Sequence, residues 1–270
     1  MKNFNSNVNT EVNFPEINMI DLLEAGAHFG HKANRWNPKM AKYIFGQKNG
    51  IHVINLQKTI PLMQRAFKAV YDVAASGGRI LFVSTKKQSS DIISEYAKKC
   101  GQYYVNFRWL GGTLTNWETV SKSIKSFENT KITLEGNTSG YTKKEILQLE
   151  RKKEKFEKVL GGITEMAGVP DMLVVIDINH DATAVKEANK LGIPVVAICD
   201  TNVDPSNVTY PIPGNDDSTK AISLYCDLIT KVILLGMKEG LSAVGFDLNE
   251  SKDAQEKKNI QDKSENKGKN

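Results

Sequence analysis

The chain contains 270 residues, of which 40% are apolar and 25% charged, with a formal net charge of +5, and this composition is that of an ordinary globular protein. The length allows one main domain with a smaller appended element, and no apolar run approaches the ~20 residues needed to cross a bilayer. The three cysteines, Cys100, Cys199 and Cys226, are dispersed, which argues against a disulfide framework and a cysteine zinc site and predicts reduced core thiols.

Both ends of the chain are polar. Residues 1–18 are rich in asparagine and lack both the apolar run of a signal peptide and the arginines of a transit peptide. We therefore expect a cytoplasmic protein with a flexible N-terminal extension over residues 1–18. Residues 241–270 mix lysine, aspartate, glutamate and asparagine, and this composition predicts a disordered tail.

Between the ends, strand patterns alternate with helical patterns. After a short helix within residues 17–30, continuously apolar runs indicate strands that are covered on both faces of a parallel sheet. These runs are residues 78–85, 171–177 and 193–200, with residues 50–55 as a fourth strand and 208–212 as an edge strand that contains Pro211. Helical patterns follow at residues 57–76, 86–100, 181–191 and 216–238. Repeated strand and helix alternation predicts a layered α/β domain.

One segment, residues 117–163, interrupts this alternation. Apolar residues recur there at alternating intervals of three and four, with Lys131 and Lys153 at two positions of the repeat. The glycine-containing stretch 135–141 separates two helical halves, and Thr142 followed by Glu145 predicts a capping box. We expect an antiparallel coiled-coil hairpin at 117–163 inserted into an α/β domain of residues 19–116 and 161–240.

The charges are unevenly distributed along the chain. Residues 19–170 contain 24 cations and 13 acids, whereas residues 171–240 contain 5 cations and 10 acids. Between residues 25 and 71 there are eight cations and no acid. This asymmetry indicates that the earlier part meets a polyanion, and we expect the later part to face solvent or basic protein neighbours.

Metal and nucleotide sites are the first alternatives. His28 and His31 are three residues apart, but no carboxylate lies near them in sequence to complete a ligand set, so we assign no metal site. The predicted strands also lack the glycine-rich loops that bind phosphates. Aspartates follow several of these strands (Asp177, Asp181, Asp200 and Asp204), and we interpret them as helix caps and turn residues. No residue is nominated as catalytic.

Aromatic and cationic residues recur together in three predicted loops: NRWNPKMAKYIFG, then STKK at 84–87, then NFRWLGGTLTNW at 106–117. Lysine and arginine neutralise phosphates, aromatic rings can stack on exposed bases, and glycines allow close approach of backbone N–H groups. Each tryptophan on its own is interpreted as a buried anchor of its loop. Clustered cations without compensating acids favour RNA binding.

In order and spacing, these motifs resemble those of the S2 family of small-subunit ribosomal proteins, in its bacterial or organellar form. The resemblance covers residues 19–240 and includes LLEAGAHFGH, RWNPKMAKYIFG, ILFVSTKK, RWLGGTLTNW, LGGITEM, PDMLVVID and IPGNDD. Ser84 replaces a common glycine of the family, and Phe107 a frequent histidine. The resemblance implies a flavodoxin-like three-layer α/β/α sandwich with a coiled-coil hairpin. It also implies a non-catalytic protein without cofactors that binds small-subunit rRNA at the junction of head and body and helps to recruit the OB-repeat protein that captures mRNA.

We predict that unpaired basic side chains from separate loops converge on one flank and bind rRNA by charge neutralisation and shape. The predicted rRNA-binding residues are Lys32, Arg35, Trp36, Lys39, Lys42, Lys86, Lys87, Arg108 and Trp109. Two alternatives remain open. One is an enzyme or sensor that holds a phosphorylated ligand near Ser84, Lys86 and Asp200, and the other is a protein-docking module that uses the hairpin and the acidic later half.

Overall fold

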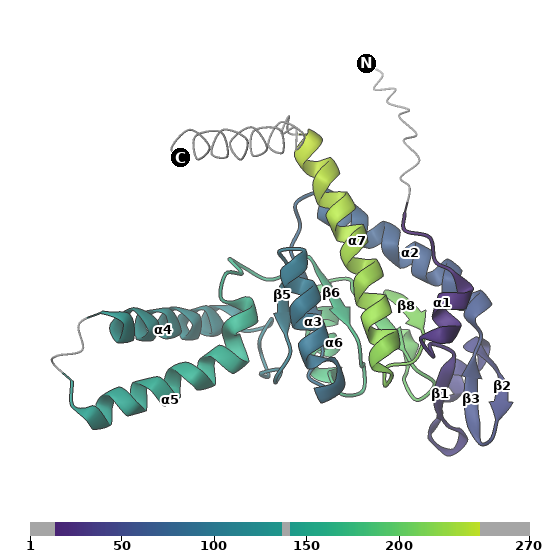
Figure 1. Cartoon of the computed structure of the whole chain (residues 1–270), viewed down its shortest axis with the longest axis horizontal. Coiled ribbons are helices and arrows are strands. Elements are labelled where there is room, and N and C mark those ends of the chain that lie inside the picture. Colours follow the sequence, from purple (N-terminus) through teal and green to yellow (C-terminus); the bar gives the residue numbers. More distant parts are fainter. Residues whose placement is uncertain (1–13, 137–140, 244–270) are drawn as a thin grey trace, which may run out of the picture.

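The computed structural model describes residues 14–136 and 141–243 and is built around a five-stranded parallel sheet (Figure 1). Its strands are β4 (Ile80–Val83), β5 (Tyr103–Val105), β6 (Met172–Val175), β7 (Val195–Cys199) and β8 (Tyr210–Pro213). They lie side by side in the order β5-β4-β6-β7-β8. Counted along the chain this order is 2-1-3-4-5, which is the order of a flavodoxin-like sheet, and the α/β prediction is confirmed.

The sheet is buried on both faces because its strands carry apolar side chains at every position. Phe82 and Val174 belong to the core on one face, together with residues of α2 (Leu56–Ala75), α3 (Lys87–Lys99) and α7 (Thr219–Ala243). Val83 and Val175 belong to the core on the other face, together with residues of α6 (Ala182–Leu191). Successive strand residues point to opposite faces of the sheet, so a continuous apolar run contributes side chains to the core on each face.

The predicted helices are present and close to their expected bounds. Besides α2, α3, α6 and α7, the short N-terminal helix α1 spans Met19–Glu24, with the side chain of Asn18 accepting a hydrogen bond from the backbone of Ile20. The prediction of an edge strand that contains Pro211 is also confirmed, because β8 is the terminal strand of the described sheet and pairs there with β7. All three cysteines are free and buried, as predicted. Among the helices of the described ranges, none is long and apolar enough to span a membrane.

The strand at residues 50–55 is real, but its predicted place in the parallel sheet is wrong. This strand, β3 (Ile51–Ile54), forms a separate antiparallel sheet with β1 (Phe29–Lys32) and β2 (Ile44–Lys48) in the order β1-β3-β2. A two-residue turn at Asn49 and Gly50, with φ values of 53° and 76°, joins β2 to β3. An Asn-Gly pair with left-handed backbone specifies a tight hairpin, and this pairs β3 with its sequence neighbour.

Two helices extend to one side of the sheet domain, α4 (Trp117–Glu135) and α5 (Lys143–Leu160) (Figure 1). They pack against each other, with the rings of Phe127 and Phe156 6.1 Å apart. Val120 and Leu160 share a core cluster with the sheet, so the start of α4 and the end of α5 both lie at the domain. The capping box of Thr142 and Glu145 is confirmed. Sustained coiled-coil packing along the pair stays a prediction.

Parts of the predicted terminal segments and of the helix connection lie outside the described residues. These parts are residues 1–13 of the extension, 244–270 of the tail and 137–140 of the connection. In the described part of the extension, Phe14 packs edge-on against Tyr71 of α2 with ring centroids 5.6 Å apart. Residues that immediately precede α1 are therefore held on the surface of the fold.

Candidate nucleic-acid interface

The three predicted basic segments meet at one edge of the parallel sheet, where its strands end. Val83 and Val105 are register partners at the ends of β4 and β5, so the loops that follow them leave the same edge. The segment after β1 reaches this edge near β7, because the backbone N–H of Asn37 donates to the carbonyl of Thr201 at 2.8 Å. From β5 to β7 the edge spans three strand spacings, or about 14 Å.

The segments that meet near this edge carry exposed cations. Five of the predicted contact residues are exposed: Lys32, Arg35, Lys42, Lys87 and Arg108. In the described part of the chain, the ion pairs that involve predicted contact residues are those of Lys39 and Lys86. The five exposed side chains therefore keep their positive charge available to an external anion.

The three tryptophans differ in how far they are buried. Trp36 is 40% exposed and its ring lies 5.3 Å from that of His52, so the interpretation of Trp36 as a buried anchor is wrong. The reason is that the 3-10 turns that flank it, Ala33–Arg35 and Pro38–Tyr43, bury Met40 and Tyr43 in its place. Trp109 and Trp117 are half-buried and pack against the core. Trp36 thus offers a ring face beside the cations.

The loop that carries Arg108 and Trp109 is held by Glu187, a buried carboxylate on α6. Its two oxygens accept hydrogen bonds from the indole N–H of Trp109 and from the backbone N–H groups of Gly112, Leu114 and Thr115, at 2.7 to 3.2 Å. Burial would raise the pKa of Glu187, but these hydrogen bonds outweigh it and lower that pKa. The sequence analysis missed Glu187, although an acid among the apolar positions of α6 is a usable signal.

The other two basic segments are also held by residues of the later half, one by an aspartate and one by a threonine. At the loop after β4, the backbone N–H and the hydroxyl of Thr85 donate to the two oxygens of Asp181, at 3.1 and 2.7 Å. At β1, the N–H of His31 donates to the Thr201 hydroxyl at 2.9 Å. Gly30 permits this approach, because a Cβ there would lie 2.6 Å from the Thr201 side chain.

Lys39 does not match the expectation that the basic side chains are unpaired. Its ammonium lies 2.6 Å from a carboxylate oxygen of Asp204, and both side chains are at least partly exposed. The hydrogen bond from Lys39 and those from Ser206 lower the pKa of Asp204 to about 2. Asp204 also caps the 3-10 turn Pro205–Asn207, which confirms its interpretation as a turn residue.

For Lys86 the expectation of an unpaired cation is wrong. Its side chain is only 18% exposed, and its ammonium contacts the carboxylates of Asp177, Asp216 and Asp217. The physical reason is the parallel sheet itself, which brings the residues that follow β4, β6 and β8 to one edge. Burial would lower the pKa of Lys86, but the hydrogen bond to Asp217 and the charges of Asp216 and Asp177 raise it.

This acid-rich place does not suit a phosphorylated ligand. The carboxylates there outnumber Lys86, and they would repel a phosphate. Burial, followed by the charges of Asp200 and Asp177, raises the pKa of Asp216 to about 7. The hydroxyl of Ser84 is buried and paired with that of Ser89, so it is not available to a ligand. The alternative of an enzyme or sensor with a phosphate near Ser84, Lys86 and Asp200 therefore gains no support.

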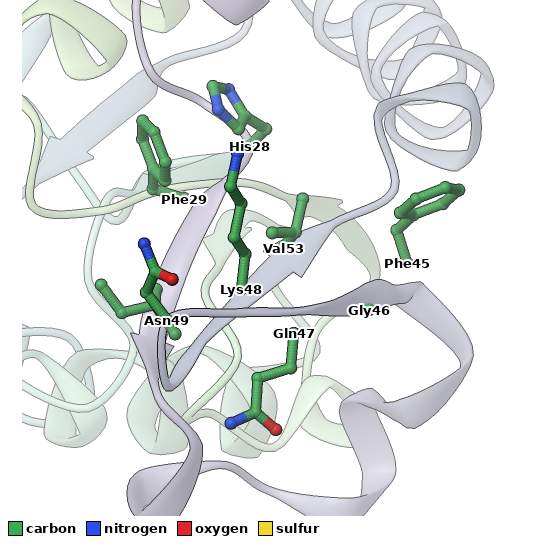
Figure 2. A pocket seen from close by; sticks show the side chains of 9 residues that line it. His28, Phe29, Phe45, Gly46, Gln47, Lys48, Asn49 and Val53 are labelled. Atoms are coloured by element: carbon green, nitrogen blue, oxygen red, sulfur yellow. The ribbon is translucent and has the colours of Figure 1, made fainter.

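The two histidines of the first basic segment point to different surroundings. Burial lowers the pKa of His28, whose ring lies 4.0 Å from that of Phe29 at a pocket of about 630 Å³ in the antiparallel sheet (Figure 2). His31 faces the aspartates instead, with Nδ1 3.1 Å from Asp200 and Nε2 3.5 Å from Asp217. The sequence analysis found no carboxylate near His31, because these partners lie in the later half of the chain.

Comparison with known proteins shows a family match over most of the chain. The family model described as "Ribosomal protein S2" matches residues 22–236. A protein from Caulobacter vibrioides is 56% identical over 237 residues, which are 88% of this chain and 88% of that protein. A protein from Granulibacter bethesdensis is 54% identical over 234 residues, covering 87% of this chain and 91% of that protein. Both relatives are named small ribosomal subunit protein uS2.

Proposed function

Because the chain belongs to the ribosomal protein S2 family, we propose that it is a structural component of the small ribosomal subunit that binds rRNA through the basic edge of its sheet. The family is structural and non-enzymatic. One observation supports the assignment of the surface: five exposed cations come from segments far apart in sequence, and these segments meet near the edge at which the parallel strands end.

The chemistry of this surface fits phosphate neutralisation better than the reading of base edges. Among the five cations, Lys32 ends β1, Arg35 and Lys42 lie in 3-10 turns, Lys87 begins α3, and Arg108 lies in the loop after β5. Cations spread over such an edge follow the course of an RNA backbone and position it without selecting its sequence. Trp36 and Phe107, which are 40% and 57% exposed, add ring surfaces for stacking on unpaired bases.

The salt dependence of rRNA binding tests this proposal. Five phosphate contacts give a slope of about −3.5 to −4.5 in log affinity against log salt, since each contact contributes roughly 0.7 to 0.9. The triple variant Arg35→Gln, Lys42→Gln and Arg108→Gln should reduce the magnitude of that slope by about 2 to 3. The measurement is a filter-binding or fluorescence titration of the full chain with small-subunit rRNA at several salt concentrations.

A matched control triple is Lys99→Gln, Lys158→Gln and Lys231→Gln. These lysines are also exposed but pair with acids four residues away on α3, α5 and α7. The control should keep the parent slope. If both triples lose the same slope, or neither loses any, the basic edge is not the rRNA-binding surface.

Cytoplasmic incorporation at the junction of head and body of the subunit is the second part of the proposal. It is supported by the family membership and by the basic edge. A chain with a small affinity tag, expressed in a bacterium, should sediment with small-subunit fractions in a sucrose gradient. Chemical footprinting of the rRNA should then protect nucleotides of the head and body that face each other, and protection confined to one of the two would contradict this placement.

We also propose that the antiparallel sheet helps to recruit the OB-repeat protein that captures mRNA. Phe29 and Phe45 are 50% and 77% exposed, and both line the pocket of Figure 2. Exposed aromatic rings around a pocket are a favourable contact for a partner protein. The double variant Phe29→Ser and Phe45→Ser should lower the amount of this partner in purified subunits and leave rRNA affinity unchanged.

The alternative of a docking module based on the helix pair is tested on the same subunits. The distal part, residues 129–154, can be replaced by a short linker, which leaves Phe127 and Phe156 in contact and the proximal residues in the core. Under our proposal the shortened chain still recruits the OB-repeat protein. Loss of that partner with intact rRNA binding would transfer the docking function to the helix pair.

A further inference from the structure

The loop that follows β6, residues 176–181, reaches the basic edge without a lysine or an arginine. In the sheet, β6 lies between β4 and β7. Lys87 follows β4, and the first basic segment reaches Thr201 after β7. The loop therefore lies between two cationic segments, at strands that are two spacings or about 10 Å apart. It carries His180, which the rRNA-binding proposal does not use.

The imidazole of His180 is held by the loop that follows β4. Its Nδ1 lies 2.7 Å from the hydroxyl oxygen of Thr85, and that hydroxyl donates to Oδ1 of Asp181 at 2.7 Å. A hydroxyl has one hydrogen to donate, and the carboxylate accepts it, so Nδ1 of His180 donates its N–H to Thr85. Two successive hydrogen bonds, which end on the buried Asp181, therefore fix the orientation of the ring and its tautomer.

The other ring nitrogen of His180 is left to an external group. Within residues 14–136 and 141–243 the ring makes its hydrogen bond through Nδ1, and the side chain is 51% exposed. Because Nδ1 carries a hydrogen already, a second proton binds at Nε2. The neutral ring offers Nε2 as an acceptor, whereas the protonated ring donates an N–H there and carries a positive charge.

The charged groups closest to His180 are already paired within the fold. On its own loop, Oδ1 of Asp181 is 3.9 Å from Nδ1, and Asp177 accepts the backbone N–H of His180 at 2.9 Å. From the loop after β4, the ammonium of Lys86 lies 3.2 Å from Asp177. Burial raises the pKa of Asp181, although its hydrogen bonds from Thr85 act in the opposite direction.

The segment that follows β7 adjoins the same loop, through a hydrogen bond from Asn179 to the carbonyl of Asn202. Its two aspartates, Asp200 and Asp204, lie beside His31 and Lys39 respectively. Among these groups, the imidazole of His180 is therefore the one that combines exposure with a nitrogen free to meet an anion.

We propose that His180 is a further rRNA contact, which takes up a proton from solvent as RNA binds and donates from Nε2 to a phosphate between the two cationic segments. Thr85 is a positioning residue, because it acts on the RNA only through the imidazole that it orients. This inference rests on the proposed binding of rRNA by the basic edge. It adds a pH dependence to that binding, since an imidazole exchanges a proton between about pH 5 and 8.

A purely structural role for the ring is the competing interpretation. The imidazole then only links the loop after β6 to the loop after β4, and Nε2 meets water. Such a link affects stability, but it does not change the number of phosphates that the protein neutralises. The slope of log affinity against log salt counts those phosphates, so it distinguishes the two roles.

The test is a titration of the full chain with small-subunit rRNA at several salt concentrations, at about pH 8 and at about pH 5.5. In the parent chain the magnitude of the salt slope should increase at the lower pH. In His180→Gln this increase should be smaller by about 0.7 to 0.9, the share of one phosphate contact. Affinity at the lower pH and near physiological salt should fall about three- to tenfold, and affinity at the higher pH should be nearly unchanged.

Two other groups titrate in the same range and stay in place in this comparison. Burial raises the pKa of Asp216 to about 7, and Asp200 beside the ring raises the pKa of His31. Both groups are present in the parent chain and in His180→Gln, so their effect cancels in the difference between the two.

The matched control is His28→Gln, because His28 lies at the pocket of the antiparallel sheet (Figure 2). It should keep the pH dependence of the parent chain. Thr85→Val should lose part of that dependence, whereas Thr85→Ser, which retains a hydroxyl, should keep it. Circular dichroism verifies the folding of each variant.

The proposal is overturned if the salt slope of the parent chain is the same at both pH values, or if folded His180→Gln retains the full increase. It is also overturned if His28→Gln loses as much of the increase as His180→Gln does. A parent chain without any salt slope would instead contradict the proposed binding of rRNA by the basic edge, so the two failures are distinguishable.

Discussion

The segments that carry the exposed cations and those that carry the buried carboxylates meet near the same edge of the parallel sheet but come from opposite halves of the chain. The cations belong to residues 32–108 and lie at the surface, whereas Asp177, Asp181, Glu187 and Asp200 belong to the later half and are nearly inaccessible. The expectation that the acidic half faces solvent or basic neighbouring proteins is therefore wrong for these residues. Much of the negative charge of the later half is therefore buried inside the fold. There, acids such as Asp181 and Glu187 accept hydrogen bonds from the loops that carry the exposed cations.

The largest expected effect comes from removing a buried acid. Glu187→Ala leaves the donors of Trp109, Gly112, Leu114 and Thr115 without their acceptor. We expect a loss of about 3 to 5 kcal/mol in the free energy of unfolding, measured by urea denaturation. The exposed Glu165→Ala is the control and should change stability by less than about 0.5 kcal/mol. If Glu187→Ala lowers the free energy of unfolding by less than about 1 kcal/mol, the loop does not depend on Glu187 for its stability.

Lys86 and Lys87 are adjacent in sequence, but Lys86 is largely buried among carboxylates and Lys87 is exposed. Lys86→Met removes the ammonium from three carboxylates and should lower the free energy of unfolding by about 2 to 3 kcal/mol. Lys87→Met should leave stability within about 0.5 kcal/mol of the parent, because its side chain is exposed. Denaturation and rRNA titration of both variants would separate the two roles, and equal stability of the two would remove the distinction.

A single exposed cation should act on rRNA affinity alone. Arg108→Gln removes one charge from the loop held by Glu187, so affinity near physiological salt should fall about three- to tenfold and the salt slope by roughly 0.7 to 0.9. The thermal midpoint should stay unchanged. If Arg108→Gln lowers stability as well, the arginine is part of the loop's support and not of its outer surface.

The smallest expected effect concerns the exposed pair of Lys39 and Asp204. In the folded chain the pKa of Asp204 is lowered from its usual 3.8 to about 2. The stabilisation that this carboxylate contributes is therefore present above pH ~4 and disappears as the pH falls towards 2. Lys39→Ala should return the Asp204 pKa towards 3.8, as followed by carboxyl carbon NMR. An unchanged pKa would assign the shift to the hydrogen bonds from Ser206.

Much of the fold could be predicted from local patterns. Continuous apolar runs identified β4, β6 and β7, and the capping box at Thr142 marked the start of α5. Strands β1 and β2 were not predicted from the sequence, and neither was the Asn49-Gly50 turn that joins β2 to β3. Strand β5 was not predicted either; it has three residues and is the terminal strand of the order β5-β4-β6-β7-β8. Short strands carry little periodicity, so tertiary pairing decides where they form.

The candidate site was predictable in part, for the same reason. Clusters of cations without acids are visible in the sequence, and they led to Arg35, Lys42, Lys87 and Arg108, which the structure leaves exposed. Lys86 looked identical to Lys87, because no local pattern distinguishes a lysine that turns inward from one that turns outward. Glu187 and His31 gained their roles from partners more than 70 residues away.

By itself, the sequence determined the alternation of strands and helices, the helical segment within residues 117–163, the membership of the ribosomal protein S2 family and the unequal charge of its two halves. Only the tertiary structure decided which charges remain available to an anion and which are held inside. The physical reason is that parallel strands end at a common edge, so contacts such as that between His31 and Thr201 join positions 170 residues apart. Burial and pairing at that edge are properties of the folded chain and have no signal in a local window of sequence.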